Sequence, residues 1–218
     1  MRIDQTCRKT AALTLVEISV VIVAIMIVLI VVLLPALSRP RERSSRISCL
    51  NCLKQVGLAA QVFAADNEEK FPWRVSTKAG GSLEYLNVPN SAFRHFLAIS
   101  NELSTPKVLL CPEDKERTAE IDWLIGNQNI RYFVGLKATE INANSILSGD
   151  RKLMTNGVPV GTGLVELTTK LTAAWTARIH KNAGNVLLGD GHVDALSNNR
   201  LQEQLIDSGV ATNRLLIP

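Results

Sequence analysis

One apolar segment near the N-terminus limits what this chain can fold into. Between residues 13 and 38 the only charged side chain is Glu17, and residues 18–34 contain no polar side chain other than Ser19. About 20 apolar residues are enough to cross the hydrocarbon core of a bilayer as one helix. The segment is also longer than the apolar region of a cleaved signal peptide, which is usually about 7–15 residues. We therefore expect a transmembrane helix over residues 13–38, with a signal peptide cleaved after Ser38 as the alternative.

Basic residues flank this segment on both sides. Arg2, Arg8 and Lys9 precede it, and residues 39–54 carry four arginines and one lysine against one glutamate. The formal net charge of +4 is therefore concentrated around the apolar segment, and residues 55–218 are nearly neutral. A nearly neutral body offers no electrostatic surface for a phosphate backbone. The pattern is typical of a membrane protein, and we expect no nucleic acid among the partners.

The helical pattern continues beyond the apolar segment but becomes amphipathic. Apolar residues recur there at helical spacing, with charged and amide side chains between them: Ile47, Leu50, Leu53, Val56, Ala60 and Phe63. We predict that this amphipathic half occupies residues 39–66 and that the helix ends before Phe71-Pro72. Pro35 removes one backbone donor and is expected to kink the helix.

The remainder of the chain, residues 67–218, mixes short elements with turns and predicts a globular head. Helices are predicted at 91–102 and 198–207, and strands at 108–110, 130–136 and 145–147. Residues 171–180 and 185–197 lie on either side of residues 181–184 and predict a β-hairpin. The combination predicts an α+β fold in which one long helix packs against a small antiparallel sheet.

Glu17 is the residue of the apolar segment that requires a functional explanation. An ionisable group inside an apolar stretch is costly unless it has a partner. It lies in Ala12-Leu13-Thr14-Leu15-Val16-Glu17, after a short basic leader and before the long apolar run. This arrangement resembles the cleavage and methylation motif of prepilins, the precursors of type IV pilins and of type II secretion pseudopilins.

The resemblance implies a role for each end of the motif. A prepilin peptidase would cut between Ala12 and Leu13 and methylate the new amine of Leu13. Glu17 would pair with the same amine of a neighbouring subunit during filament assembly. Opposite charges attract far more strongly in apolar surroundings than in water. The family favours glycine in place of Ala12 and Phe or Met in place of Leu13, so slower processing is expected.

The resemblance also implies an organisation and a location. Residues 1–12 would be a leader peptide, and the long helix with its α+β head would form a pilin-like fold. The protein would be a single-pass inner-membrane protein with its head in the periplasm or at the cell surface. Its partners would be the peptidase and other pilin-like subunits, and neither an enzymatic activity nor a cofactor is expected. The positive-inside rule alone slightly favours the opposite orientation.

Three cysteines follow the leader, whereas Cys7 lies within it. Cys49 and Cys52 could form half of a zinc site, but the sequence offers no second pair of ligands at suitable spacing. An exported head would enter an oxidising compartment, which favours a disulfide. We expect Cys49–Cys111, which would tie the helix to the head. Cys52–Cys111 and three reduced thiols are the alternatives.

Near the C-terminus, His180 is followed after nine residues by Asp190-Gly191. This His-x9-Asp-Gly signature, together with Cys111-Pro112-Glu113-Asp114 and residues 146–150, resembles a bacterial subfamily of prepilin-motif proteins. Facing hairpin strands could bring His180, Asp190 and His192 together as a metal or acid–base site. The chain would then be a membrane-tethered extracytoplasmic binding module or a metal-dependent enzyme. The structural explanation is that residues 189–191 form a tight turn, and it is the one we favour.

Overall fold

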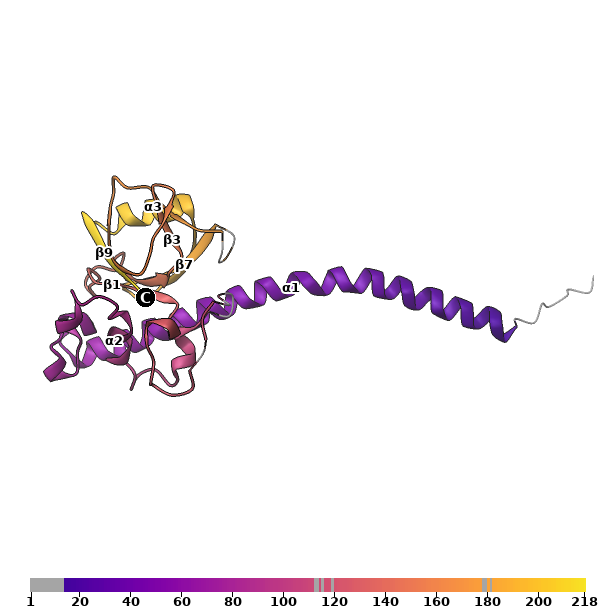
Figure 1. Ribbon diagram of the computed structural model, residues 1–218, viewed down its shortest axis with the longest axis horizontal. Coiled ribbons are helices and arrows are strands. Elements are labelled where there is room, and N and C mark those ends of the chain that lie inside the picture. Colours follow the sequence, from indigo (N-terminus) through magenta and orange to yellow (C-terminus); the bar gives the residue numbers. More distant parts are fainter. Residues whose placement is uncertain (1–13, 112–113, 115, 119, 178–179, 181) are drawn as a thin grey trace, which may run out of the picture. The chain divides into compact units, whose positions relative to one another are not determined.

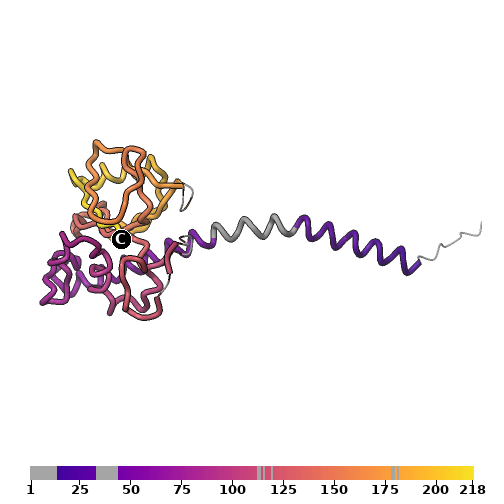
Figure 2. Tube along the Cα trace, viewed as in Figure 1, coloured from indigo at the N-terminus to yellow at the C-terminus, as the bar shows by residue number. Residues whose placement is uncertain are grey.

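The computed structural model describes residues 14–111, 114, 116–118, 120–177, 180 and 182–218, with the side chains of residues 33–43 excepted. These residues form two compact units, residues 1–44 and residues 45–218, which we describe separately. The described residues are coloured in Figure 2, and the secondary-structure elements are labelled in Figure 1. The predictions for Cys7, Ala12 and Leu13 lie outside the described residues, and the kink at Pro35 stays a prediction.

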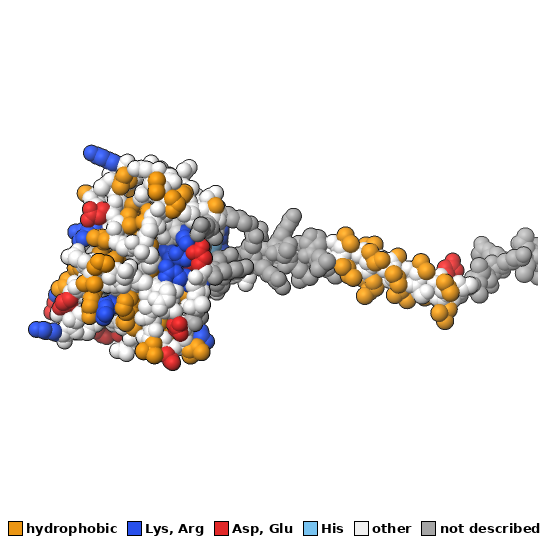
Figure 3. Space-filling model, in the orientation of Figure 1, with side chains coloured by type: hydrophobic (Ala, Val, Ile, Leu, Met, Phe, Trp, Pro, Cys, Tyr) orange, Lys and Arg blue, Asp and Glu red, His pale blue; other side chains and the backbone are white. Residues whose placement is uncertain are grey.

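The first unit contains the apolar part of a long helix. Helix α1 runs from Leu15 to Asp66, and its side chains from Leu15 to Val32 are all exposed. Apolar side chains cover the visible side of this part of the helix in Figure 3. Residues 15–32 are long and apolar enough to cross a membrane. The structure therefore confirms an N-terminal apolar helix.

The second unit begins with the amphipathic part of α1. Its buried side chains recur every three or four residues and form the centre of a core: Cys49, Leu53, Val56, Ala60, Phe63 and Ala64. Residues 44–66 are also long and apolar enough to cross a membrane, but 44% of the most apolar 18-residue stretch within them is buried inside the protein. After Asp66, the side chain of Asn67 donates a hydrogen bond to the Phe63 carbonyl (2.8 Å). The helix therefore ends where the sequence predicted.

The head is built on an antiparallel sheet of six strands in the order β5-β9-β1-β2-β7-β8. Its strands are β1 (Tyr132–Gly135), β2 (Ile146–Asp150), β5 (Gly163–Thr168), β7 (Ala183–Leu188), β8 (Val193–Ser197) and β9 (Thr212–Ile217). A second sheet, in the order β4-β3-β6, consists of Val158–Pro159, Leu153–Thr155 and Ala173–Trp175. The described helices of the head are α2 (Ala92–Leu97), α3 (Asn198–Asp207) and five 3₁₀ helices at 72–74, 77–79, 83–85, 106–109 and 127–129. The α+β fold class is therefore confirmed.

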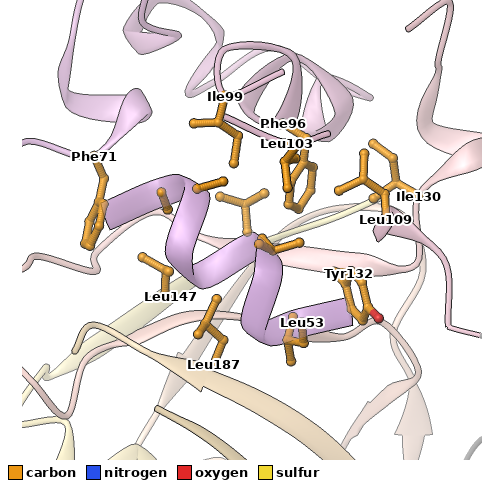
Figure 4. Close-up of a cluster of buried hydrophobic side chains, with 14 of the residues drawn as sticks. Leu53, Phe71, Phe96, Ile99, Leu103, Leu109, Ile130, Tyr132, Leu147 and Leu187 are labelled. Carbon is orange, nitrogen blue, oxygen red and sulfur yellow. The ribbon is translucent and has the colours of Figure 1, made fainter. Parts of the chain in front are cut away.

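Both faces of the six-stranded sheet are buried at its central strands, whereas the edge strands β5 and β8 are partly exposed. Successive side chains of a strand point to opposite faces, so Tyr132 and Leu147 join the core around α1 whereas Phe133 and Ile146 join a second core with α3. Figure 4 shows the first core, with the sheet residues beneath the helix. The two layers lie close together at Gly57, where an added Cβ would be 2.6 Å from the Leu187 Cδ1 atom.

The structure contradicts the predicted hairpin of residues 171–180 with 185–197. Strand β6 pairs with β3 in the small sheet, and β7 pairs with β8 instead. The connection is a three-residue loop, in which the Gly191 N–H donates to the Leu188 carbonyl (3.0 Å) and Gly191 has a φ of 82°. Such loops require a residue with positive φ, which glycine adopts without strain. Gly184 is not part of a turn, because it lies in β7 against Trp175.

The strand predicted at residues 108–110 is also wrong. Pro106 begins a 3₁₀ helix that runs to Leu109, and the Thr105 side chain caps it by accepting a hydrogen bond from Lys107 N. Proline is favoured in the first turn of a helix because it lacks only a donor that would have no partner there. Val108 and Leu109 are buried, and the conformation of this run follows from Pro106.

A buried histidine makes the stability of this fold dependent on pH. The His95 side chain is 2% exposed, and its Nδ1 lies 2.7 Å from Ser82 Oγ. Burial lowers the pKa of His95 from 6.5 to about 4. The folded protein therefore binds fewer protons than the unfolded chain in this range, and its stability is full above pH 6.5 and falls as the pH drops toward 4.

We expect the titration of His95 to lower the free energy of unfolding by about 3 kcal/mol between pH 6.5 and pH 4, since one pKa unit corresponds to about 1.36 kcal/mol. In His95→Asn the amide can keep the contact with Ser82 but does not titrate. The difference in unfolding free energy between the wild type and His95→Asn should therefore change with pH between 6.5 and 4. Urea unfolding of the full chain in detergent micelles measures it, and a constant difference would contradict the prediction.

Candidate functional site

The N-terminal end of α1 contains the first candidate residue, Glu17. Thr14 precedes the helix, and its Oγ1 accepts a hydrogen bond from the Glu17 backbone N–H (3.3 Å). This is half of a capping box, in which a hydroxyl satisfies an N–H that has no partner within the helix. A carboxylate in the first turn also interacts favourably with the helix dipole. Glu17 therefore has a local structural role in addition to the one implied by the prepilin motif.

The second candidate site lies in the head, around a disulfide between Cys49 and Cys111. Cys49 belongs to α1, and Cys111 follows the 3₁₀ helix at 106–109. Their Cα atoms are 4.8 Å apart, and both residues are buried. Cys52 is the free cysteine among the described residues, and partial burial raises the pKa of its thiol. The pairing is the one that the sequence analysis named first.

His180 lies against this disulfide. Its Nε2 atom is 3.6 Å from Cys111 Sγ and 3.1 Å from Asn185 Nδ2. Its carbonyl accepts a hydrogen bond from Arg46 Nη2 of α1 (2.9 Å), and its φ of 52° places it in the left-handed region. The side chain is 3% exposed. The geometry explains why a histidine at this position is held firmly, since both its backbone and its ring have partners.

A buried carboxylate completes the contacts of His180. Asp150, at the end of β2, has its Oδ2 atom 3.5 Å from His180 Nε2. The same oxygen accepts a hydrogen bond from the Asn185 backbone N–H (2.7 Å), whereas Oδ1 is buried without a hydrogen bond from any described residue. Burial raises the pKa of Asp150 to about 7, and the hydrogen bond from Asn185 opposes this shift. The site therefore holds a carboxyl group with unused acceptor capacity.

An ionic cluster adjoins these residues along the chain. Asp114 is buried, and its carboxylate lies 3.4 Å from Arg131 Nη1 and 3.0 Å from Arg151 Nη2. Arg131 Nη1 also donates to the Cys111 carbonyl (2.9 Å). The exposed Glu116 contacts Arg151 and Lys152, and hydrogen bonds from these two side chains lower the pKa of Glu116 to about 2. The buried charges are therefore paired, as buried charges must be to persist.

The structure does not bring His180, Asp190 and His192 together. His180 precedes β7, and the other two follow it; at about 3.3 Å per residue a six-residue strand separates its ends by roughly 20 Å. Asp190 Oδ1 accepts a hydrogen bond from His192 N (2.8 Å) within the β7–β8 turn, and His192 lies 3.2 Å from Asp194 at the surface. The geometry therefore gives no support to the alternative of a metal or acid–base site formed by these three residues, and it agrees with the favoured explanation of a turn.

The actual neighbours of His180 were not identified from the sequence as site residues. Asp150 lies in the segment 146–150, which was noted only for its resemblance, and Asn185 and Arg46 carried no signal of their own. Asp150 is a charged residue at the end of the fully buried strand β2, and Asn185 is a buried polar residue inside β7. Polar residues within buried strands are the signal that could have identified them, because such groups need partners.

Comparison of the chain with models of known protein families, with curated proteins and with solved structures gave no match.

The disulfide should contribute strongly to stability because it closes a long loop. For a separation of 62 residues, the loss of loop-closure entropy in the unfolded chain corresponds to about 4 kcal/mol. We expect the double variant Cys49→Ala/Cys111→Ala to lose about that much unfolding free energy in urea. Cys52→Ala is the matched control and should lose less than half as much. Equal losses in the two variants would contradict the prediction.

We expect the Asp114 carboxylate, which pairs with Arg131 and Arg151, to contribute to the stability of the head. Asp114→Asn would remove the carboxylate partner of the buried Arg131, whereas Arg151 would keep its contact with Glu116. Breaking a buried pair costs about 3–5 kcal/mol. Glu203→Gln removes the exposed pair with Arg200, which is expected to contribute less than about 1 kcal/mol. Thermal unfolding of both variants compares the two losses. Similar losses would show that the central carboxylate is not needed.

Proposed function

We propose that this chain is a pilin-like subunit that a prepilin peptidase processes and that assembles into a type IV pilus or a type II secretion pseudopilus. One observation carries the proposal. A single helix is apolar and exposed on all sides over residues 15–32, has one acid in its first turn, and becomes a core element of an α+β head after residue 44. The layout is compatible with that of pilins.

The exposed apolar part of α1 requires an environment other than water. Each described side chain from Leu15 to Val32 is exposed, and most are Val, Ile or Leu. A helix that is apolar on all sides belongs in a bilayer or among other helices. A prepilin passes from the first environment to the second, which is why one segment can serve as a membrane anchor and as an assembly surface.

Glu17 lies in the part of α1 that we place in the bilayer or among other helices. A carboxylate at this position is costly in hydrocarbon unless a cation or a hydrogen-bond donor accompanies it. Cleavage before Leu13 would create an amine four residues ahead of Glu17, and the amine of a neighbouring subunit supplies the missing charge. The carboxylate thus favours assembled subunits over isolated ones.

The proposed location follows from the head. Its buried Cys49–Cys111 disulfide is of the kind that persists in an oxidising compartment. We infer a single-pass inner-membrane protein whose head lies in the periplasm or at the cell surface. The alternative, a metal-dependent module using His180, Asp190 and His192, has no support in the geometry, because these residues lie at opposite ends of β7.

Mass spectrometry of the full chain from the membrane fraction tests the processing step. We expect an N-terminus at Leu13 that carries one additional methyl group, with some unprocessed chain because Ala12 replaces the glycine that the family favours. Ala12→Gly should decrease the unprocessed fraction. An N-terminus after Ser38, or a fully unprocessed chain, would contradict the proposal.

Variants of the capping pair test the assembly role of Glu17. Glu17→Ala removes the carboxylate, whereas Thr14→Ala removes the capping hydroxyl and leaves the carboxylate in place. If Glu17 pairs with an amine, Glu17→Ala should lower the yield of sheared filaments or of cross-linked multimers at least tenfold, with membrane insertion unchanged. Thr14→Ala should assemble. Equal defects in both variants would indicate that Glu17 acts only through helix capping.

A further inference from the structure

The sulfur atoms of the disulfide lie near two further groups that can bind metals, the imidazole of His180 and the carboxylate of Asp150. Cys49 Sγ, Cys111 Sγ and one ring nitrogen of His180 all lie within 4.8 Å of one another, and all three residues are buried. They come from three separate places in the sequence: α1, the segment after residue 109, and the residues before β7. Thiolate and imidazole are the ligands that zinc prefers.

The distances around His180 match the edges of a zinc tetrahedron. With zinc–sulfur bonds of about 2.3 Å and zinc–nitrogen bonds of about 2.0 Å, a tetrahedral site places sulfur and nitrogen about 3.5 Å apart. His180 Nε2 lies 3.6 Å from Cys111 Sγ and 3.5 Å from Asp150 Oδ2. Two of the edges thus have suitable lengths before any rearrangement.

Asp150 supplies an acceptor that the fold leaves unused. Its side chain is 2% exposed, and its Oδ1 atom accepts no hydrogen bond from the described residues. Buried acceptors without a partner are rare in folded proteins, and each calls for an explanation. Its second oxygen is fixed by the Asn185 backbone N–H, as carboxylate ligands of metals commonly are.

We propose that the reduced protein binds one zinc ion through Cys49, Cys111, His180 and Asp150. The same two sulfur atoms form either the disulfide or two metal bonds, so the oxidised and the zinc-bound forms exclude each other. This inference does not depend on filament assembly. It concerns the state in which the chain exists before its disulfide has formed, or after a reductant has opened it.

A dithiol reductant gives two electrons and two protons to the Cys49–Cys111 bond, which breaks into two thiols while the reductant closes to its own disulfide. Zinc then binds both sulfurs as thiolates, and two protons leave to solvent. In the disulfide form, Asn185 Nδ2 lies 3.1 Å from His180 Nε2. In the zinc-bound form, the metal would replace Asn185 Nδ2 as the partner of His180 Nε2. Arg46 would continue to hold the His180 carbonyl.

The test uses the full chain in detergent micelles, with Cys7→Ser and Cys52→Ser so that Cys49 and Cys111 are the remaining cysteines of four. The protein is produced in a reducing cytosol and kept with a trialkylphosphine. Alkylation under denaturing conditions and intact mass verify that both thiols are free before each titration. We expect one zinc ion per chain by elemental analysis in the reduced protein and none in a preparation oxidised to the disulfide.

Cobalt(II) reports which ligands are used. In the reduced protein it should give thiolate charge-transfer absorption and the intense visible bands of a tetrahedral site. His180→Gln should weaken zinc binding by more than the 10–100-fold that is typical of losing an outer-shell partner, and Asp150→Asn should weaken it as well. His192→Gln is the matched control, because His192 is exposed on the β7–β8 turn, and it should bind like the parent.

Several outcomes would overturn the proposal. They are a reduced protein that binds no zinc, cobalt bound without thiolate absorption, and zinc binding that His180→Gln leaves unchanged. Circular dichroism of each variant shows whether it is folded. The cobalt spectrum of the parent decides the question by itself if His180→Gln does not fold.

Discussion

The burial of one face of α1 against one face of the six-stranded sheet is the contact on which the rest of the head depends. Gly57 lets the helix approach Leu187 closely, and Leu53 and Phe63 fill the space beside it. Because the opposite face of the sheet is covered by α3, every central strand is buried on both sides. The strands between α1 and α3 therefore have few positions for polar side chains. The polar side chains that do occur there need hydrogen-bond partners inside the protein.

The helices could be predicted from the sequence better than the sheet. The end of α1 and the bounds of α3 follow from local periodicity and agree with the structure. The hairpin of β7 with β8 was missed because residues 185–197 were predicted as one strand, whereas this range contains both β8 and most of β7. Gly191, which needs a positive φ, determines that β8 is the partner. Asp150 and Asn185 were missed because a contact between two strands leaves no local pattern.

The geometry gives the His-x9-Asp-Gly signature a physical meaning. His180 fixes the start of β7 through its contacts with Arg46 and Asn185, and Asp190-Gly191 form the turn at the other end of the same strand. In this chain the nine-residue spacing reflects the length of one strand and not a shared site. The His180 ring contacts the disulfide and Asp150, and neither of them belongs to the signature.

The Cys49–Cys111 bond also has a mechanical consequence. A pull on the N-terminal helix travels along its backbone and reaches the first buried residue of the head at Cys49. The disulfide transfers part of that load directly to Cys111, which Arg131 joins to the start of β1. The 61 residues between the two cysteines form a loop that the disulfide closes, and the load does not have to pass through this loop. Tension on the helix therefore acts on the sheet without first unravelling the segment that contains α2.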